Sequence, residues 1–198
     1  MNKEFYIAGG ERYNTPEQPV SAPIFRRKFT YRQGKNKNGV KLKISATGFY
    51  RLFLNGAELT KGYFAPYIAN SDDLVYYDEY SLADSLKNGE NVIYVLLGNG
   101  FTNSIDGNIW NFESAAYRAA PKFSLEIIQD GVEILASDET FEVCDSPIYF
   151  DDYRCGERYS AGTGGVECGG LFTGRNLRKA ILCKSPERRR KEMRGTTD

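Results

Sequence analysis

A two-residue turn placed between apolar runs constrains the fold more than any other feature of this sequence. The turn is Asn55-Gly56, a pair that favours a type I′ hairpin because both central residues of that turn take positive φ. Upstream, residues 40–47 alternate between apolar and polar side chains, which is the period-two pattern of a half-buried strand. Residues 49–54 form a second run directly before the turn. These features predict consecutive antiparallel strands.

Other short runs have the composition of β-strands. Residues 74–80 and 92–97 are rich in Tyr and β-branched side chains, and residues 121–128 alternate before a second hairpin turn at Asp130-Gly131. Residues 24–31 form the first strand, and we expect it at a sheet edge because three adjacent cations interrupt its alternation. Many short strands joined by Gly and Asn turns predict an all-β fold, an antiparallel β-sandwich of the jelly-roll kind.

The same region resembles a known family. The linked pieces are GFYRLFLNGAEL, an Ala-Pro turn, YYDEYSLADSLKNGENVIYVLLGNGF and, later, CGERY at residues 155–159. In this order and spacing they resemble the N-terminal β-sandwich domain of bacterial α-L-rhamnosidases, from about Phe25 to Tyr159. The resemblance implies a galactose-binding-like sandwich that is not catalytic. It also implies a partner, a catalytic (α/α) barrel that carries the acids and that this sequence does not contain. After Tyr159 the family pattern is lost.

We expect three regions along the chain. Residues 1–23 contain three of the seven prolines and are predicted to form an extended N-terminal arm. Residues 24–160 would form the sandwich domain. Residues 161–198 would form a degenerate or flexible basic tail, because from Arg175 onward nine Lys and Arg face three Asp and Glu. A nucleic-acid role would rest on residues 188–191 alone, so no nucleic-acid partner is expected.

Composition excludes several kinds of site. The chain has no histidine, which rules out a Ser-His-Asp triad, a Cys-His pair and histidine-ligated metals. The four cysteines lack the C-x-x-C spacing of zinc sites and are expected to be reduced thiols. No apolar run has the length of a signal peptide core or of a membrane helix, which takes about 20 residues. A cytoplasmic protein without a membrane partner is the expectation.

Two loops combine aromatic rings with polar side chains, the combination that a sugar-binding site uses. Residues 63–73 mix three aromatics with oxygen ligands suited to calcium, and residues 101–117 contain the only Trp. The structural alternatives are that the aromatics of the first loop plug the end of the sandwich and that the second loop caps the core. The candidate substrate-binding residues are Tyr63, Tyr67, Asp72, Asp106, Asn108 and Trp110.

Three acids near the end of the domain, Asp151, Asp152 and Glu157, could suggest a glycosidase pair. We interpret them as solvated surface acids, since the resemblance places the catalytic acids in the helical barrel. No catalytic residue is therefore predicted in this chain. The expected function is that of an accessory domain, which packs on the barrel or presents a rhamnose-containing glycan to it. The alternative is a free-standing, lectin-like carbohydrate-binding module, with calcium as a possible ligand.

Overall fold

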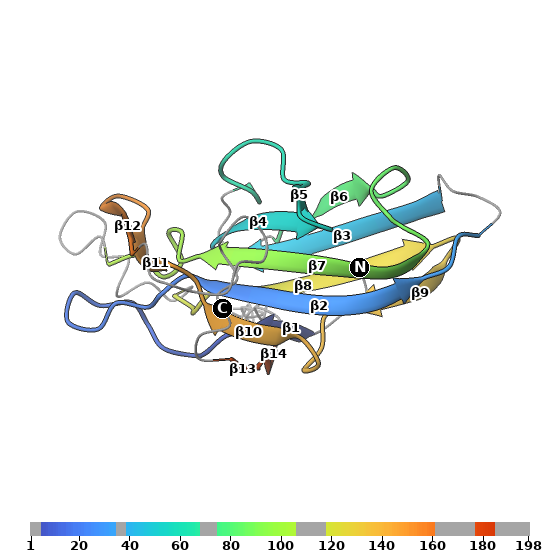
Figure 1. The fold of residues 1–198 in the computed structure, drawn as a ribbon. Helices are drawn as coiled ribbons and strands as arrows, with labels where there is room; N and C mark the ends of the chain where they lie inside the picture. The colour runs from blue at the N-terminus through green and yellow to red at the C-terminus, as the bar shows by residue number, and fades with distance from the viewer. Residues whose placement is uncertain (1–4, 35–38, 68–74, 106–117, 161–176, 185–198) are drawn as a thin grey trace, which may run out of the picture.

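Two antiparallel sheets form a sandwich in the computed structural model, which describes residues 5–34, 39–67, 75–105, 118–160 and 177–184 (Figure 1). The first sheet has the order β14 (Ile181–Lys184), β1 (Phe5–Ala8), β8 (Lys122–Gln129), β3 (Val40–Thr47) and β6 (Asp78–Ser81), with β9 (Val132–Ala136) paired to β8. The second has the order β13 (Arg178–Lys179), β10 (Glu142–Asp145), β2 (Pro23–Tyr31), β7 (Gly89–Gly98), β4 (Phe49–Leu54) and β5 (Ala57–Glu58). A separate hairpin joins β11 (Ile148–Asp152) to β12 (Gly156–Tyr159).

The predicted all-β class and antiparallel sandwich are confirmed. Strands β2, β3, β4, β6, β7 and β8 are paired only antiparallel, and the chain passes from one sheet to the other between most of them. No α-helix occurs in the described ranges. Within those ranges, therefore, no helix is long and apolar enough to cross a membrane.

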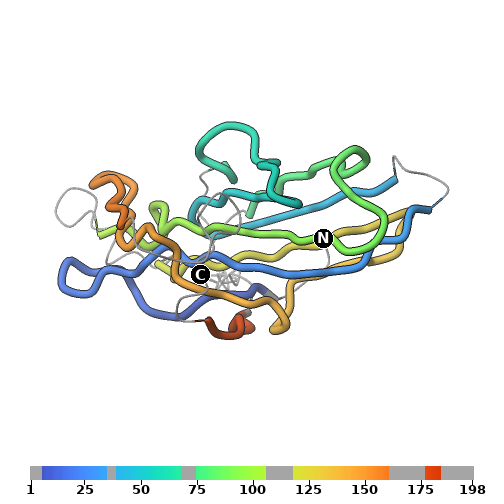
Figure 2. The backbone as a smooth tube through the Cα atoms, viewed as in Figure 1, coloured from blue at the N-terminus to red at the C-terminus, as the bar shows by residue number. Residues whose placement is uncertain are grey.

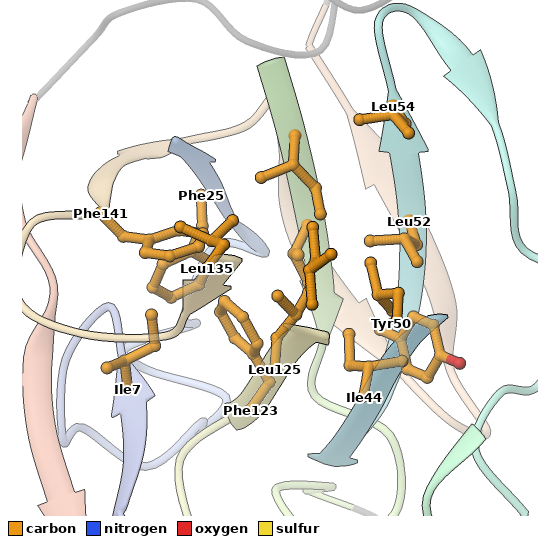
Figure 3. Close-up of a cluster of buried hydrophobic side chains, with 14 of the residues drawn as sticks. Ile7, Phe25, Ile44, Tyr50, Leu52, Leu54, Phe123, Leu125, Leu135 and Phe141 are labelled. Carbon is orange, nitrogen blue, oxygen red and sulfur yellow. The ribbon is translucent and has the colours of Figure 1, made fainter. Parts of the chain in front are cut away.

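The core lies between the sheets and follows the alternation seen in the sequence (Figure 3). Leu42 and Ile44 of β3 are fully buried and face Leu52 of β4 across the interior. Phe123 anchors the middle of the cluster, with its ring centroid 4.9 Å from that of Phe25 and 5.8 Å from that of Phe141. Burial of each such side chain stabilises the folded state by about 1.5–3 kcal/mol relative to leaving the side chain in water.

Both predicted hairpin turns are present. Asn55 and Gly56 have φ of 52° and 87°, and Asp130 and Gly131 have φ of 50° and 84°. Positive φ at both central positions is what a type I′ turn requires. The turns therefore fix the registers in which Leu54 pairs with Ala57 and Gln129 pairs with Val132.

The first predicted strand is not an edge strand. Strand β2 lies between β10 and β7, so it is hydrogen-bonded to a strand on each side. Its cations are accommodated because acids lie across from them: Arg26 donates to Glu142 at 2.7–2.9 Å, and Lys28 lies 3.4 Å from Glu90. Cross-strand charge pairing thus explains the broken alternation that suggested an edge.

The predicted N-terminal arm and the C-terminal region both contribute short strands to the sandwich. Strand β1 pairs with β14 from Phe5–Lys184 to Ala8–Ile181, at one edge of the molecule (Figure 2). Ile7 of this pair is fully buried in the core. The pairing joins segments far apart in sequence, so neither short run shows a local signal. Residues 161–176 and 185–198 lie outside the described residues.

Candidate functional site

A groove of about 810 Å³ lies on the outer face of the second sheet, between two projecting segments. One wall is the loop after β5, and the other is the β11–β12 hairpin, which stands at one end of the sandwich (Figure 1). Strands β4 and β7 supply the floor. The described residues that line the groove are Ala22, Phe49, Tyr50, Arg51, Glu58, Thr60, Gly62, Tyr63, Phe64, Leu96, Gly98, Ile148, Asp151 and Glu157.

A bidentate ion pair between Arg51 and Glu58 forms the polar part of the groove floor. Arg51 Nε lies 2.8 Å from Glu58 Oε1, and Arg51 Nη2 lies 2.7 Å from Glu58 Oε2. The hydrogen bonds from Arg51 hold the pKa of the Glu58 carboxyl below its usual range. The Thr60 hydroxyl accepts a hydrogen bond of 2.6 Å from the Leu52 backbone, which ties the start of the loop to β4. The floor is thus a fixed array of donors and acceptors.

The loop after β5 presents aromatic rings to solvent. Tyr63 is 92% exposed and Phe64 is 68% exposed. The Phe64 ring packs 5.1 Å from Phe49 of β4, whose ring lies 6.3 Å from Tyr153 of the β11–β12 turn. The alternative in which Tyr63 and Tyr67 plug the end of the sandwich is therefore wrong, because both rings lie outside the core.

A buried carboxylate lies beneath the hairpin wall. Asp151 is 8% exposed and accepts hydrogen bonds from the Asn99 backbone N–H at 2.6 Å and from Asn99 Nδ2 at 2.7 Å. Burial raises its pKa to about 6 against the effect of these bonds, and the charges of Glu157 and Asp152 add to the increase. Gly98 leaves space for this carboxylate, because a Cβ added at position 98 would lie 3.0 Å from Asp151 Oδ2.

The neighbouring acid has a structural role. Asp152 accepts hydrogen bonds from the Ser104 hydroxyl at 2.8 Å and from the Ile105 backbone at 2.7 Å, as well as from the N–H groups of Arg154 and Cys155. Although burial favours the neutral form, these bonds together hold its pKa below the ordinary value. The interpretation of Asp151 and Asp152 as solvated surface acids is wrong: both organise the backbone around them.

The structure separates the predicted site residues. Tyr63 lines the groove, whereas Tyr67 projects from the same loop and packs its ring 6.2 Å from Tyr76. Asp72, Asp106, Asn108 and Trp110 lie outside the described residues. Sequence reasoning missed Arg51 and Glu58, whose signal is that they lie four residues before and two residues after the Asn55-Gly56 turn and so come onto adjacent strands.

No group of three or more His, Cys, Asp or Glu side chains forms a candidate metal site among the described residues. The oxygen-rich part of the 63–73 loop, for which calcium was considered, falls in a range that the structure does not describe, so calcium stays a prediction. No disulfide links Cys144, Cys155 and Cys183 to one another in the part of the chain that the structure describes.

Comparison with known proteins shows the family. Residues 35–165 match the family model of the alpha-L-rhamnosidase N-terminal domain. The chain belongs to this family. It is 30% identical over 159 residues to an alpha-L-rhamnosidase of Formosa agariphila, an alignment that covers 73% of this chain and 16% of that protein.

Solved rhamnosidases share the fold. The alpha-L-rhamnosidase of Dictyoglumus thermophilum superimposes with a TM-score of 0.70 at 22% identity over 92% of this chain, and that of Aspergillus terreus with 0.71 at 22% over 90%. The Streptomyces avermitilis alpha-L-rhamnosidase, complexed with L-rhamnose, gives 0.68 at 23% over 82%. The alignments span 21%, 21% and 16% of those chains, so the rhamnosidase N-terminal domain is a small part of each.

Proposed function

We propose that this chain is the accessory N-terminal domain of a larger α-L-rhamnosidase and packs against its catalytic (α/α) barrel. The observation that carries the proposal is the family match, which covers residues 35–165 and includes the sandwich from β3 to the β11–β12 hairpin. The described residues form strands and no α-helix, so they do not supply a helical barrel. The reaction of the whole protein would be hydrolysis of terminal α-L-rhamnose with inversion, by an acid and a base acting through a water.

The isolated chain is expected to be inactive. Asp151 and Glu157 are cross-strand partners in the groove, but both oxygens of Asp151 are occupied by Asn99. An inverting pair needs one carboxyl to protonate the leaving group and the other to activate a water on the opposite side of the sugar. Incubation of the purified chain with an aryl α-L-rhamnoside should release no phenol. If the wild-type chain hydrolysed the substrate and the Asp151→Asn variant did not, the chain would itself be catalytic.

The packing role has a separate test. The chain and the catalytic region of its protein can be produced as separate polypeptides and mixed. Co-elution on a sizing column is the expected result, because the accessory domain would bury part of its surface against the barrel. Independent elution at high concentration, together with full hydrolytic activity of the catalytic region alone, would contradict it.

The second candidate function is a carbohydrate-binding, lectin-like module. The exposed rings of Tyr63 and Tyr67 favour it, since both large aromatic side chains lie in solvent on a loop beside the groove. Calorimetric titration with L-rhamnose, with and without calcium, tests this function. Heat that is lost in the Trp110→Ala variant would place the binding site in the 101–117 loop, and absence of heat in both conditions would leave the packing role alone.

A further inference from the structure

We propose that the groove between the loop after β5 and the β11–β12 hairpin binds one neutral sugar residue and rejects anionic sugars such as uronates. The proposal deepens the carbohydrate-binding function and rests on it. It assigns the site to the floor and walls of the groove, with Tyr63, Arg51, Glu58 and Glu157 as the contacting side chains. The 101–117 loop, which holds Trp110, is a different place in the chain.

The size of the groove suits a small ligand. Its volume of about 810 Å³ falls within the range of roughly 300–1,000 Å³ that small-molecule sites occupy. The floor is a paired β-sheet surface, in which β4 and β7 are joined from Phe49–Gly98 to Leu54–Ile93. A site built on sheet strands is held rigidly, so little ordering is needed when a ligand enters.

The aromatic wall provides the apolar contact. Tyr63 is 92% exposed and therefore contributes little to the stability of the fold, while Phe64 is held against Phe49 at 5.1 Å. The C–H groups of a pyranose form a flat apolar face that packs on such a ring. The Tyr63 hydroxyl remains at the edge of that contact and can bond to a sugar hydroxyl, which is the amphipathic use that tyrosine has in binding sites.

The polar groups of the floor suit vicinal hydroxyls. Arg51 and Glu58 hold each other in a planar, bidentate arrangement at 2.7–2.8 Å, which places a donor group directly beside an acceptor group. The Thr60 hydroxyl accepts a hydrogen bond from the Leu52 backbone N–H, and a hydroxyl can also donate its own proton. Adjacent hydroxyls of a sugar both donate and accept, so one residue of a neutral glycan can satisfy this array.

The charge of the groove determines whether it prefers neutral or anionic sugars. Of its described lining residues, Arg51 is the one cation, and it is paired with Glu58. Asp151 and Glu157 then leave the groove with negative charge that no described lining cation offsets. A carboxylate on the ligand would be repelled by these acids, whereas a neutral sugar would not.

The test uses saturation-transfer NMR on the purified chain with methyl α-L-rhamnopyranoside and with sodium D-galacturonate as probes. We expect transfer to the neutral glycoside and at least tenfold weaker binding of the uronate. Tyr63→Ala should weaken binding of the neutral glycoside about tenfold, a loss of about 1.4 kcal/mol. Tyr77→Ala is the control, because Tyr77 is an exposed tyrosine (53%) that lies outside the groove lining, and the variant should bind as the wild type does.

A second variant tests the charge argument. Glu157 is exposed, so Glu157→Gln should fold normally and should increase the affinity for the uronate several-fold relative to the affinity for the neutral glycoside. The proposal is overturned by absence of transfer to the neutral glycoside, by equal losses in Tyr63→Ala and Tyr77→Ala, or by stronger binding of the uronate. Binding that disappears in Trp110→Ala but survives in Tyr63→Ala would also overturn it and would place binding in the 101–117 loop. The hydrolysis and co-elution assays do not depend on Tyr63, so failure here leaves the accessory role standing.

Discussion

Asp151 connects three parts of the chain that are distant in sequence. Its carboxylate accepts from Asn99 just after β7, and its backbone carbonyl accepts from Asn14 Nδ2 at 3.3 Å. Asn99 in turn donates from Nδ2 to the Val20 carbonyl and accepts from Asn103 Nδ2 at 2.6 Å. The β11–β12 hairpin is thereby fixed against both the N-terminal segment and the end of β7, which positions one wall of the groove.

The buried position of Asp151 predicts a pH dependence of stability. Its folded-state pKa of about 6 exceeds the ordinary value of 3.8, so the folded protein binds this proton more tightly than the unfolded chain does. The stabilisation is complete below the unfolded value and is lost as the pH rises through about 6. The loss amounts to about 3 kcal/mol at most, at 1.36 kcal/mol per pKa unit.

Urea denaturation of the wild type and of Asp151→Asn at several pH values measures this effect. Between about pH 4 and pH 6, the interval between the unfolded and folded pKa values, the wild type should lose stability relative to the variant, since asparagine carries no titrating proton. The comparison with the variant removes the contributions of the other carboxyls. If the free energies of unfolding of the two proteins changed in parallel, Asp151 would not be the titrating group.

Tyr50 makes a second polar connection, between the two sheets. Its hydroxyl donates to Asp78 Oδ2 at 2.5 Å and lies 2.7 Å from the Tyr80 hydroxyl. Tyr50→Phe should reduce the free energy of unfolding by about 1–3 kcal/mol, because a hydrogen bond to a charged group is lost at a buried position. Tyr76→Phe, at a ring that is 45% exposed, is the control and should change little. Equal stabilities of Tyr50→Phe and the wild type would show that the bond contributes nothing.

Single site residues were predictable only in part. Tyr63 was found because aromatic and oxygen-bearing side chains cluster in one loop. Arg51 was not, because its role depends on a partner across a turn. Asp151 was not, because a carboxylate near the end of the sandwich domain looks the same in sequence whether it is solvated or buried. Burial and hydrogen-bond partners come from tertiary packing, which a residue's local neighbours do not encode.

Among the elements, the β4–β5 hairpin depends on Asn55 for two reasons. Its backbone has φ of 52°, and its side chain donates to the Ser85 carbonyl and to Asn91 Oδ1 and accepts from the Val92 backbone. The side chain therefore joins the hairpin turn to β7 and to the segment before it. This contact lies close to Arg51 and Glu58, so the turn also sets the groove floor.

Two substitutions separate these contributions. Asn55→Gly removes the side-chain hydrogen bonds but still permits positive φ. Asn55→Ala removes the same hydrogen bonds and also disfavours positive φ, so it should be less stable than the glycine variant by about 1–2 kcal/mol. The same alanine–glycine comparison at Asp130, where φ is 50°, gives the backbone contribution in a second turn. Thermal unfolding curves provide the measurement, and an alanine variant at least as stable as the glycine variant would contradict the argument.

Element types were easier to predict than element partners. The type I′ turns and the alternation in residues 40–47 and 121–128 depend on neighbours in sequence, and the structure confirms them. The edge position predicted for residues 24–31 failed because Arg26 pairs with Glu142, which lies more than a hundred residues away. Strand order is set by such distant pairs, and one sequence alone does not reveal them.

For the whole molecule, the edge pairing of β1 with β14 should contribute to global stability. Ile7→Ala should lower the free energy of unfolding by about 2–5 kcal/mol, because Ile7 is fully buried between the sheets. Ile181→Ala is the matched control in the paired strand, and since Ile181 is 41% exposed it should shift stability by about 0.5 kcal/mol or less. Equal effects in denaturant titrations would mean that β1 is not docked as described.

The extent of the domain was the least predictable property at this scale. Composition marked residues 1–23 and 161–198 as polar, and both regions nevertheless supply short strands. Arg178 illustrates the reason: within a basic segment, it donates to the Gly9 carbonyl at 3.0 Å and to Asp145 at 3.0 Å. A charged residue of this kind is indistinguishable in sequence from a solvated one.

The antiparallel pairing of Phe5 with Lys184 has a mechanical consequence. The polypeptide enters and leaves the sandwich at one point, so a force that separates these two residues acts on one end of the β1–β14 ladder. Its hydrogen bonds would then break one after another rather than together, beginning at that pair. A sandwich attached in this way yields at its edge under low tension, while the strands around Phe123 bear no load until the edge has opened.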